Sequence, residues 1–128
     1  MDILLWSLQG VLAFMMLMPG FLKISNSKDA LKVKGNGRMD WVDDLSDAII
    51  KLIGVLEVGA AFGLILPMLL NILPVLTPVA AIGVIFTMVG AMALHVKRND
   101  GVKAIAPNVI IMLIAAFVLY GRLEYLSF

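Results

Sequence analysis

The chain has no cysteine and a single histidine, His95, among its 128 residues. The absence of cysteine excludes disulfides, thiol redox chemistry, Cys-ligated iron–sulfur clusters and covalently attached c-type haem. One His without a Cys is a poor basis for a metal site, so we interpret the nine methionines as apolar bulk rather than as copper ligands. We therefore expect neither a metal nor another cofactor.

Charge is also scarce, because Asp, Glu, Lys and Arg make up 15% of the residues and the formal net charge is +1. So small a net charge provides no basic field that would attract nucleic acid. The sequence has no recognisable Ser/His/Asp set, no glycine-rich phosphate loop and no pair of carboxylates within one apolar run. These absences predict no catalytic residues and favour a protein that is not an enzyme.

Apolar residues are abundant, at 62% of the chain with a mean hydropathy of +1.03, whereas soluble domains have about 45–50%. Four apolar runs cover residues 3–22, 49–70, 75–94 and 105–121, and a crossing helix needs about 20 residues. No run alternates as barrel strands do. We therefore predict an all-α polytopic membrane protein, with residues 1–128 forming one four-transmembrane-helix bundle. The first run lacks the basic start and the cleavage site of a signal peptide, so we expect it to be retained.

Proline and glycine mark the expected ends of these helices. Pro19-Gly20 predicts a kink or a thinning near the end of the first run. The stretch from Asn71 to Pro78 predicts a turn followed by a helix start. We expect Pro107 in the first turn of the fourth helix, where its missing N–H costs little.

The basic residues predict an orientation in the membrane. Every Lys and Arg except Arg122 lies in residues 23–51 or 97–103. Because positive loops stay on the cytoplasmic side, we expect segments 23–48 and 97–103 to be cytoplasmic and both termini to be non-cytoplasmic. Within the first segment, Gly35-Asn36-Gly37 predicts a turn and Trp41 an interfacial anchor. The segment is either an amphipathic lead-in to the second span or a docking surface for a partner.

Glu57 is the only ionisable residue in the stretch from Leu52 to Leu70. A charged acid facing lipid there would cost about 2.5–3.5 kcal/mol. We therefore expect Glu57 to face the interior of the bundle, a partner charge or water. It lies about ten residues from the cytoplasmic loop, so the expected depth is about 15 Å, near the midplane.

Other polar or small residues in the runs are candidates for lining a pocket with Glu57. Each also has a simpler explanation: hydrogen bonding between helices, an interfacial position, snorkelling to head groups, or close helix packing. The pocket would be open to the cytoplasmic leaflet and closed by Glu57. The candidates are Gln9, Lys23, Gly54, Thr87, His95 and Asn108.

Several motifs together are similar to those of a known family. They are Pro19-Gly20-Phe21-Leu22-Lys23, Ile53-Gly54-Val55-Leu56-Glu57, Leu76-Thr77-Pro78 and Ala106-Pro107-Asn108. Across nearly its whole length the chain resembles the DoxX-like family of small four-helix membrane proteins. The resemblance implies a four-helix bundle with the carboxylate inside, and it singles out Gly20, Lys23, Gly54, Glu57, His95, Pro107 and Asn108. Relatives of the family range from a thiosulfate:quinone oxidoreductase subunit to a receptor chaperone, so the resemblance leaves the function open.

Three functions remain for such a chain. The preferred one is a chaperone-like bundle that binds a lipophilic small molecule or the transmembrane helix of a membrane-protein partner, and assists assembly or stability of a membrane complex. The second is an accessory subunit of a quinone-linked oxidoreductase, whose redox centre a partner would carry. The third is a proton-coupled small-molecule transporter that uses Glu57. Membrane lipids are expected partners, and the small residues of the second and third spans would permit a homo-oligomer.

Overall fold

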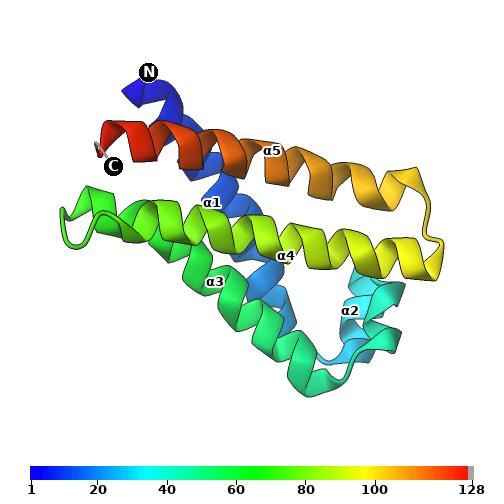
Figure 1. Ribbon diagram of the computed structural model, residues 1–128. Helices are drawn as coiled ribbons and strands as arrows, with labels where there is room; N and C mark the ends of the chain where they lie inside the picture. Colours follow the sequence, from blue (N-terminus) through cyan, green and yellow to red (C-terminus); the bar gives the residue numbers. More distant parts are fainter. Residues whose placement is uncertain (127–128) are drawn as a thin grey trace.

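The structure is a computed structural model that describes residues 1–126 (Figure 1). Its elements are α1 (Asp2–Ser25), α2 (Lys28–Gly35), the 3-10 helix η1 (Asp40–Asp44), α3 (Asp47–Leu69), α4 (Leu76–Arg98) and α5 (Val102–Tyr125). No strand occurs in this part of the chain. Of these helices, α1, α3, α4 and α5 are long and apolar enough to cross a bilayer. The predicted all-α bundle with four candidate spans is thus confirmed.

Each of the four long helices extends beyond its apolar run at one end or at both, and some of these ends are capped. Ser46 caps α3 by accepting a hydrogen bond from the backbone N–H of Ile49 at 3.2 Å. Asn99 ends α4 in the left-handed conformation, with φ of 58°. α5 begins at Val102, so the expectation that Pro107 lies in the first turn is wrong: Pro107 is inside the helix. α1 likewise continues past Pro19 to Ser25.

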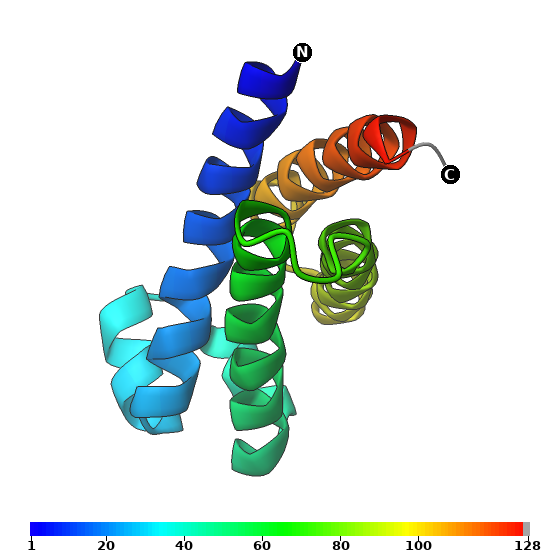
Figure 2. The ribbon, with the colours of Figure 1, turned by 90° about the vertical axis from the view of Figure 1, so that its left-hand side faces the viewer.

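The long helices form two side-by-side pairs, α1 with α3 and α4 with α5 (Figures 1 and 2). Both termini and the turn at residues 70–75 lie at one end of the bundle, called here the terminal end. Near this end, Thr77 Oγ1 donates a hydrogen bond to the Gly63 carbonyl at 3.0 Å and joins α4 to α3. Towards the opposite end the α1–α3 pair diverges from the α4–α5 pair (Figure 1).

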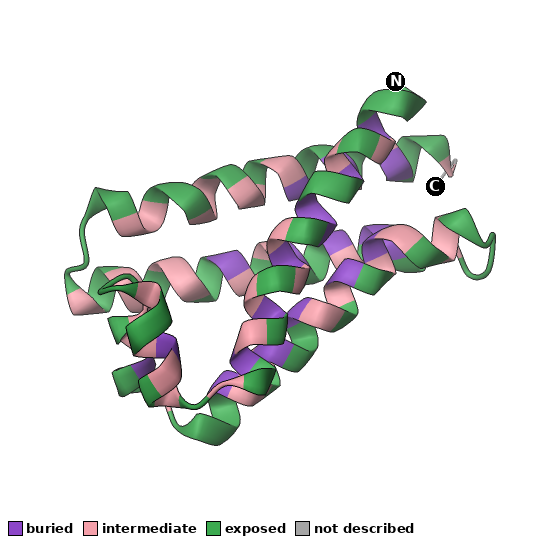
Figure 3. Cartoon of the chain, turned by 180° about the vertical axis from the view of Figure 1, so that it is seen from behind, coloured by how far each residue is buried: buried purple, intermediate pink, exposed green. Residues whose placement is uncertain are grey.

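Buried residues gather where the helices face one another (Figure 3). The main core includes Leu12, Met16, Leu64, Val84 and Val118, which come from all four long helices. These residues are nearly inaccessible, whereas many apolar side chains on the outside are exposed, as expected for a protein whose outer surface meets lipid.

A folded cap covers the end where the two pairs diverge. It consists of α2 and η1, which are joined through the turn at Asn36 and Gly37, where φ is 51° and 89°. Leu31, Val42 and Ile50 form a small core of their own beneath it. The predicted turn is therefore present, and segment 23–48 also contains a helix, α2, that was not predicted. We call this end of the bundle the capped end.

Candidate functional site

A buried ion pair joins the first two spans. Lys23 Nζ on α1 donates a hydrogen bond to Glu57 Oε1 on α3 at 2.5 Å, and the two side chains are 8% and 5% exposed. The Lys23 ammonium also lies 5.5 Å from the ring centroid of Trp41 in the cap. Glu57 therefore meets two of the expectations at once, because it faces the protein interior and has a partner charge.

Two glycines set the distance between the paired side chains. A Cβ placed on Gly20 would lie 2.9 Å from the Gly54 carbonyl oxygen, and one placed on Gly54 would lie 2.8 Å from the Gly20 carbonyl oxygen. Only residues without a side chain allow two helix backbones to approach this closely. The crossing lies between α1 and α3 at the level of Glu57, so Lys23 reaches the carboxylate directly.

The two members of the pair lie at different distances from the ends of their helices. Counted along α3, Glu57 is about 15 Å from the helix start, but Lys23 lies in the last turn of α1. Glu57 is farther from the end of its helix than Lys23 is, because α3 begins beyond the end of α1. Lys51 in the second turn of α3 shows this offset, since its Nζ donates hydrogen bonds to the carbonyls of Ile24 and Asn26 at the end of α1.

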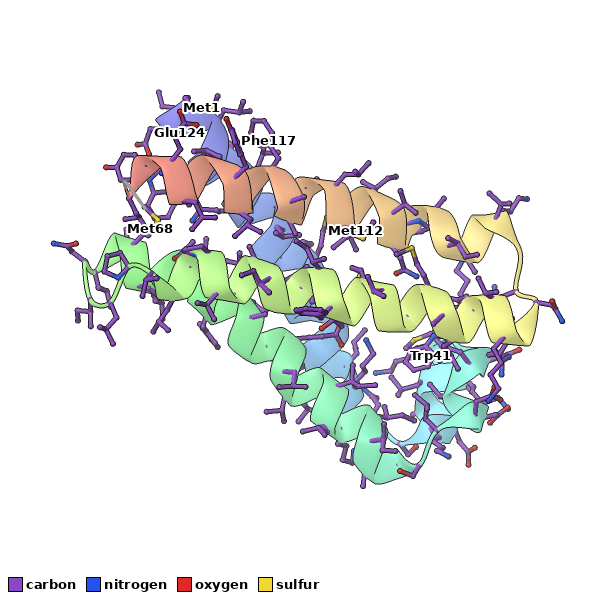
Figure 4. The ribbon with its side chains drawn as sticks, in the orientation of Figure 1. Met1, Trp41, Met68, Met112, Phe117 and Glu124 are labelled. Carbon is purple, nitrogen blue, oxygen red and sulfur yellow. The ribbon has the colours of Figure 1, made fainter. Side chains whose placement is uncertain are left out.

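The ion pair lies in the wall of a cleft of about 900 Å³ between the two diverging helix pairs. All four long helices and the cap contribute to its lining. Most of the lining is apolar and includes Met15, Met16, Ile53, Leu56 and Met88. Trp41, in η1 of the cap, lies beside α4 (Figure 4).

Five of the seven residues predicted for a pocket line this cleft: Lys23, Glu57, Thr87, His95 and Asn108. Thr87 Oγ1 donates to the Gly83 carbonyl at 2.8 Å, and Asn108 Nδ2 to the Ala104 carbonyl at 3.5 Å, each within its own helix. Gly54 does not line the cleft, but its lack of a side chain allows α1 and α3 to approach closely beside the ion pair. Gln9 is separate, because it contacts Leu64 and Arg122 towards the terminal end.

His95 belongs to a polar network at the rim of the cleft. Its Nδ1 donates to Asp100 Oδ2 at 2.7 Å, and Arg98 Nε donates to the same oxygen at 3.2 Å. The hydrogen bond from His95, followed by that from Arg98, lowers the pKa of Asp100 below its usual value of 3.8. Arg98 Nη1 also donates to Asp44 Oδ1 of η1 at 2.8 Å. The network thus fastens the end of α4 to the cap.

A third buried ionisable side chain, that of Arg122, was not predicted. It is fully buried on α5, where its Nε donates to Gln9 Oε1 at 2.5 Å and its Nη1 to Asp2 Oδ1 at 2.7 Å. The rings of Trp6 and Tyr125 lie 5.0 and 5.2 Å from its guanidinium carbon. A signal was present in the sequence, since Asp2, Trp6 and Gln9 recur at helical spacing on one face of α1. The expected role of Gln9 in joining helices is what the structure shows.

The cleft combines a largely apolar lining with a few polar groups. Among residues 1–126 no group of three or more His, Cys, Asp or Glu side chains is placed to hold a metal ion. The cleft provides apolar surface together with an ammonium, a carboxylate, a hydroxyl, an amide and an imidazole at its walls. Such an apolar lining with a few converging polar groups is typical of small-molecule sites.

These features define a polytopic helical membrane protein with four candidate spans, a folded cap at one end and a buried charge pair inside. The family model of the DoxX-like family matches residues 7–118, nearly the whole chain, so the chain belongs to the DoxX-like family. No curated protein and no solved structure matches it.

Proposed function

We propose that this protein is a non-enzymatic binding protein that holds a lipophilic small molecule in the cleft between its helix pairs. The observation that carries the proposal is the cleft itself, which all four long helices and the cap line, with the Lys23–Glu57 pair in its wall. Its volume of about 900 Å³ falls within the range of about 300–1,000 Å³ for small-molecule sites.

The lining favours an apolar ligand of variable shape. Met15, Met16, Met39 and Met88 all contribute to it, and methionine side chains adapt to different apolar surfaces because they are unbranched and flexible. The polar groups are few and lie at separate points of the wall. They would orient a hydrogen-bonding group of the ligand rather than surround a polar molecule.

The cap favours a small molecule over a partner's transmembrane helix, because Trp41 of η1 lines the cleft at one end. A partner helix would therefore have to displace α2 and η1, which have a core of their own.

The ion pair favours binding over proton-coupled transport. A transporter that used Glu57 as its switch would load and release protons at this carboxylate. Lys23 instead supplies a counter-charge within the same chain, and removing one partner of a buried pair strongly destabilises a protein. The ion pair therefore favours a role for Glu57 as a fixed part of the cleft wall.

A matched pair of glycine substitutions on α4 tests the proposal. Gly90 lines the cleft and Gly83 does not, and a Cβ at either position meets no atom within 4 Å. We expect native mass spectrometry of protein extracted gently from its own membranes to detect a bound amphiphile in the wild type and in Gly83→Phe, but not in Gly90→Phe. An empty wild type, or equal retention by both variants, would exclude the cleft as a ligand site.

A further inference from the structure

A second hollow of about 500 Å³ lies at the capped end, directly beside the apolar cleft. The two share four lining residues: Arg38, Trp41, His95 and Pro107. One side of these residues therefore faces apolar surface and the other a polar basin. The basin is completed by Gly37, Asp40, Arg98, Asp100, Lys103 and Ala104.

The basin has basic groups that the protein does not use. Arg98 is occupied, since it binds Asp44 and Asp100. Within residues 1–126, Arg38 and Lys103 make no hydrogen bond or ion pair through their side chains, and neither does the facing Asp40. Arg38, Arg98 and Lys103 thus balance the carboxylates of Asp40, Asp44 and Asp100 in number, but Arg98 is the only one of the three cations that binds any of these carboxylates, and it binds two. Arg38 and Lys103 are therefore left available to bind an anion.

The cleft matches the depth of half a bilayer, and the basin adjoins it at one end. Along α4 the cleft is lined from Thr87 to Lys97, a rise of about 15 Å. The hydrocarbon core of a bilayer is about 30 Å thick, so this is about the thickness of one leaflet. The basin adjoins the end of the cleft at which Trp41 and Lys97 lie, and tryptophan is enriched at the level of the head groups.

We propose that the ligand is a single-tailed amphiphile with an anionic phosphomonoester head, its tail in the apolar cleft and its phosphate bound by Arg38 and Lys103. This inference rests on the proposed function and specifies the class of ligand. The planar guanidinium of Arg38 can donate two parallel hydrogen bonds to a phosphate, while Lys103 supplies a second positive charge. The occupied Arg98 keeps the cap and α4 in place around the head group.

The test compares three probes on the full-length protein in a neutral detergent: oleoyl lysophosphatidate, oleoyl lysophosphatidylcholine and inorganic phosphate. Binding is measured by native mass spectrometry titration. We expect the wild type to prefer lysophosphatidate on the order of ten-fold, because two basic side chains lie beside its anionic head. In the double variant Arg38→Gln/Lys103→Gln the preference should disappear while binding of lysophosphatidylcholine persists.

The matched control is Lys28→Gln/Lys34→Gln, which removes the same charge from α2 without touching either hollow. It should keep the preference, and loss of the preference in the control would show a bulk charge effect and overturn the inference. Equal binding of the two lysolipids to the wild type would overturn the head-group assignment and leave the proposed function standing. Binding of neither lysolipid would overturn the proposed function as well. Displacement of lysophosphatidate by an equal concentration of inorganic phosphate would show a site for a free anion instead.

Discussion

Lys23 and Glu57 lie 34 positions apart in the sequence, yet their side chains form a hydrogen-bonded ion pair 2.5 Å long at the crossing of α1 and α3. The pair accounts for two charges within apolar helices, because each neutralises the other and neither faces lipid. It also joins the helix pair to the cleft, since both side chains are part of the lining.

Removal of one member of the pair should destabilise the bundle far more than removal of both. Lys23→Met or Glu57→Leu alone leaves a buried charge unpaired and should lower the free energy of unfolding by about 3–5 kcal/mol. The double variant Lys23→Met/Glu57→Leu should recover most of this loss. Denaturant titration in mixed micelles provides the double-mutant cycle. A double variant as unstable as the worse single variant would show that the charges do more than neutralise each other.

The close approach of Gly20 and Gly54 predicts a sharp steric effect. An added methyl group on Gly54 would meet the Gly20 carbonyl oxygen at 2.8 Å, so Gly54→Ala should separate α1 from α3 and cost about 1–3 kcal/mol. Gly10→Ala, on α1 with no atom within 4 Å of its Cβ, is the control and should stabilise the helix by up to about 1 kcal/mol. The same titration measures both, and equal effects would contradict the close approach.

The spans were predictable because hydrophobicity and length determine them, and Glu57 and Lys23 were identifiable because charge is rare in apolar runs. Their pairing was not predictable, because it depends on where α1 crosses α3. The helix α2 was missed because it is short and polar, and its one buried residue, Leu31, belongs to a cluster with Val42 and Ile50 from other elements. Such long-range packing leaves no local pattern.

Low pH should loosen the attachment of α4 to the α4–α5 turn. The pKa of Asp100 is lowered below 3.8, first by the hydrogen bond from His95 and then by Arg98. A carboxylate whose pKa is lowered on folding contributes stability above its unfolded pKa and loses it as pH falls through the folded value. The wild type should therefore be more stable than Asp100→Asn at pH 7, and the difference should shrink below about pH 3.8. Thermal unfolding from pH 7 to pH 3 measures it, and a constant difference would contradict this assignment.

Arg122 should be the most sensitive residue at the terminal end. Its side chain is fully buried, and Arg122→Met would leave the Gln9 carbonyl oxygen without its donor, at a cost of about 1–3 kcal/mol. Asp2→Asn removes only the ion pair, whose carboxylate side chain is 54% exposed, and should cost less than about 1 kcal/mol. Lys34→Met, an exposed lysine on α2, controls for the loss of one positive charge. If Arg122→Met unfolds at the same denaturant concentration as Lys34→Met, the contacts of Arg122 contribute nothing to the bundle, and the two ends of the chain are held together by the apolar core alone.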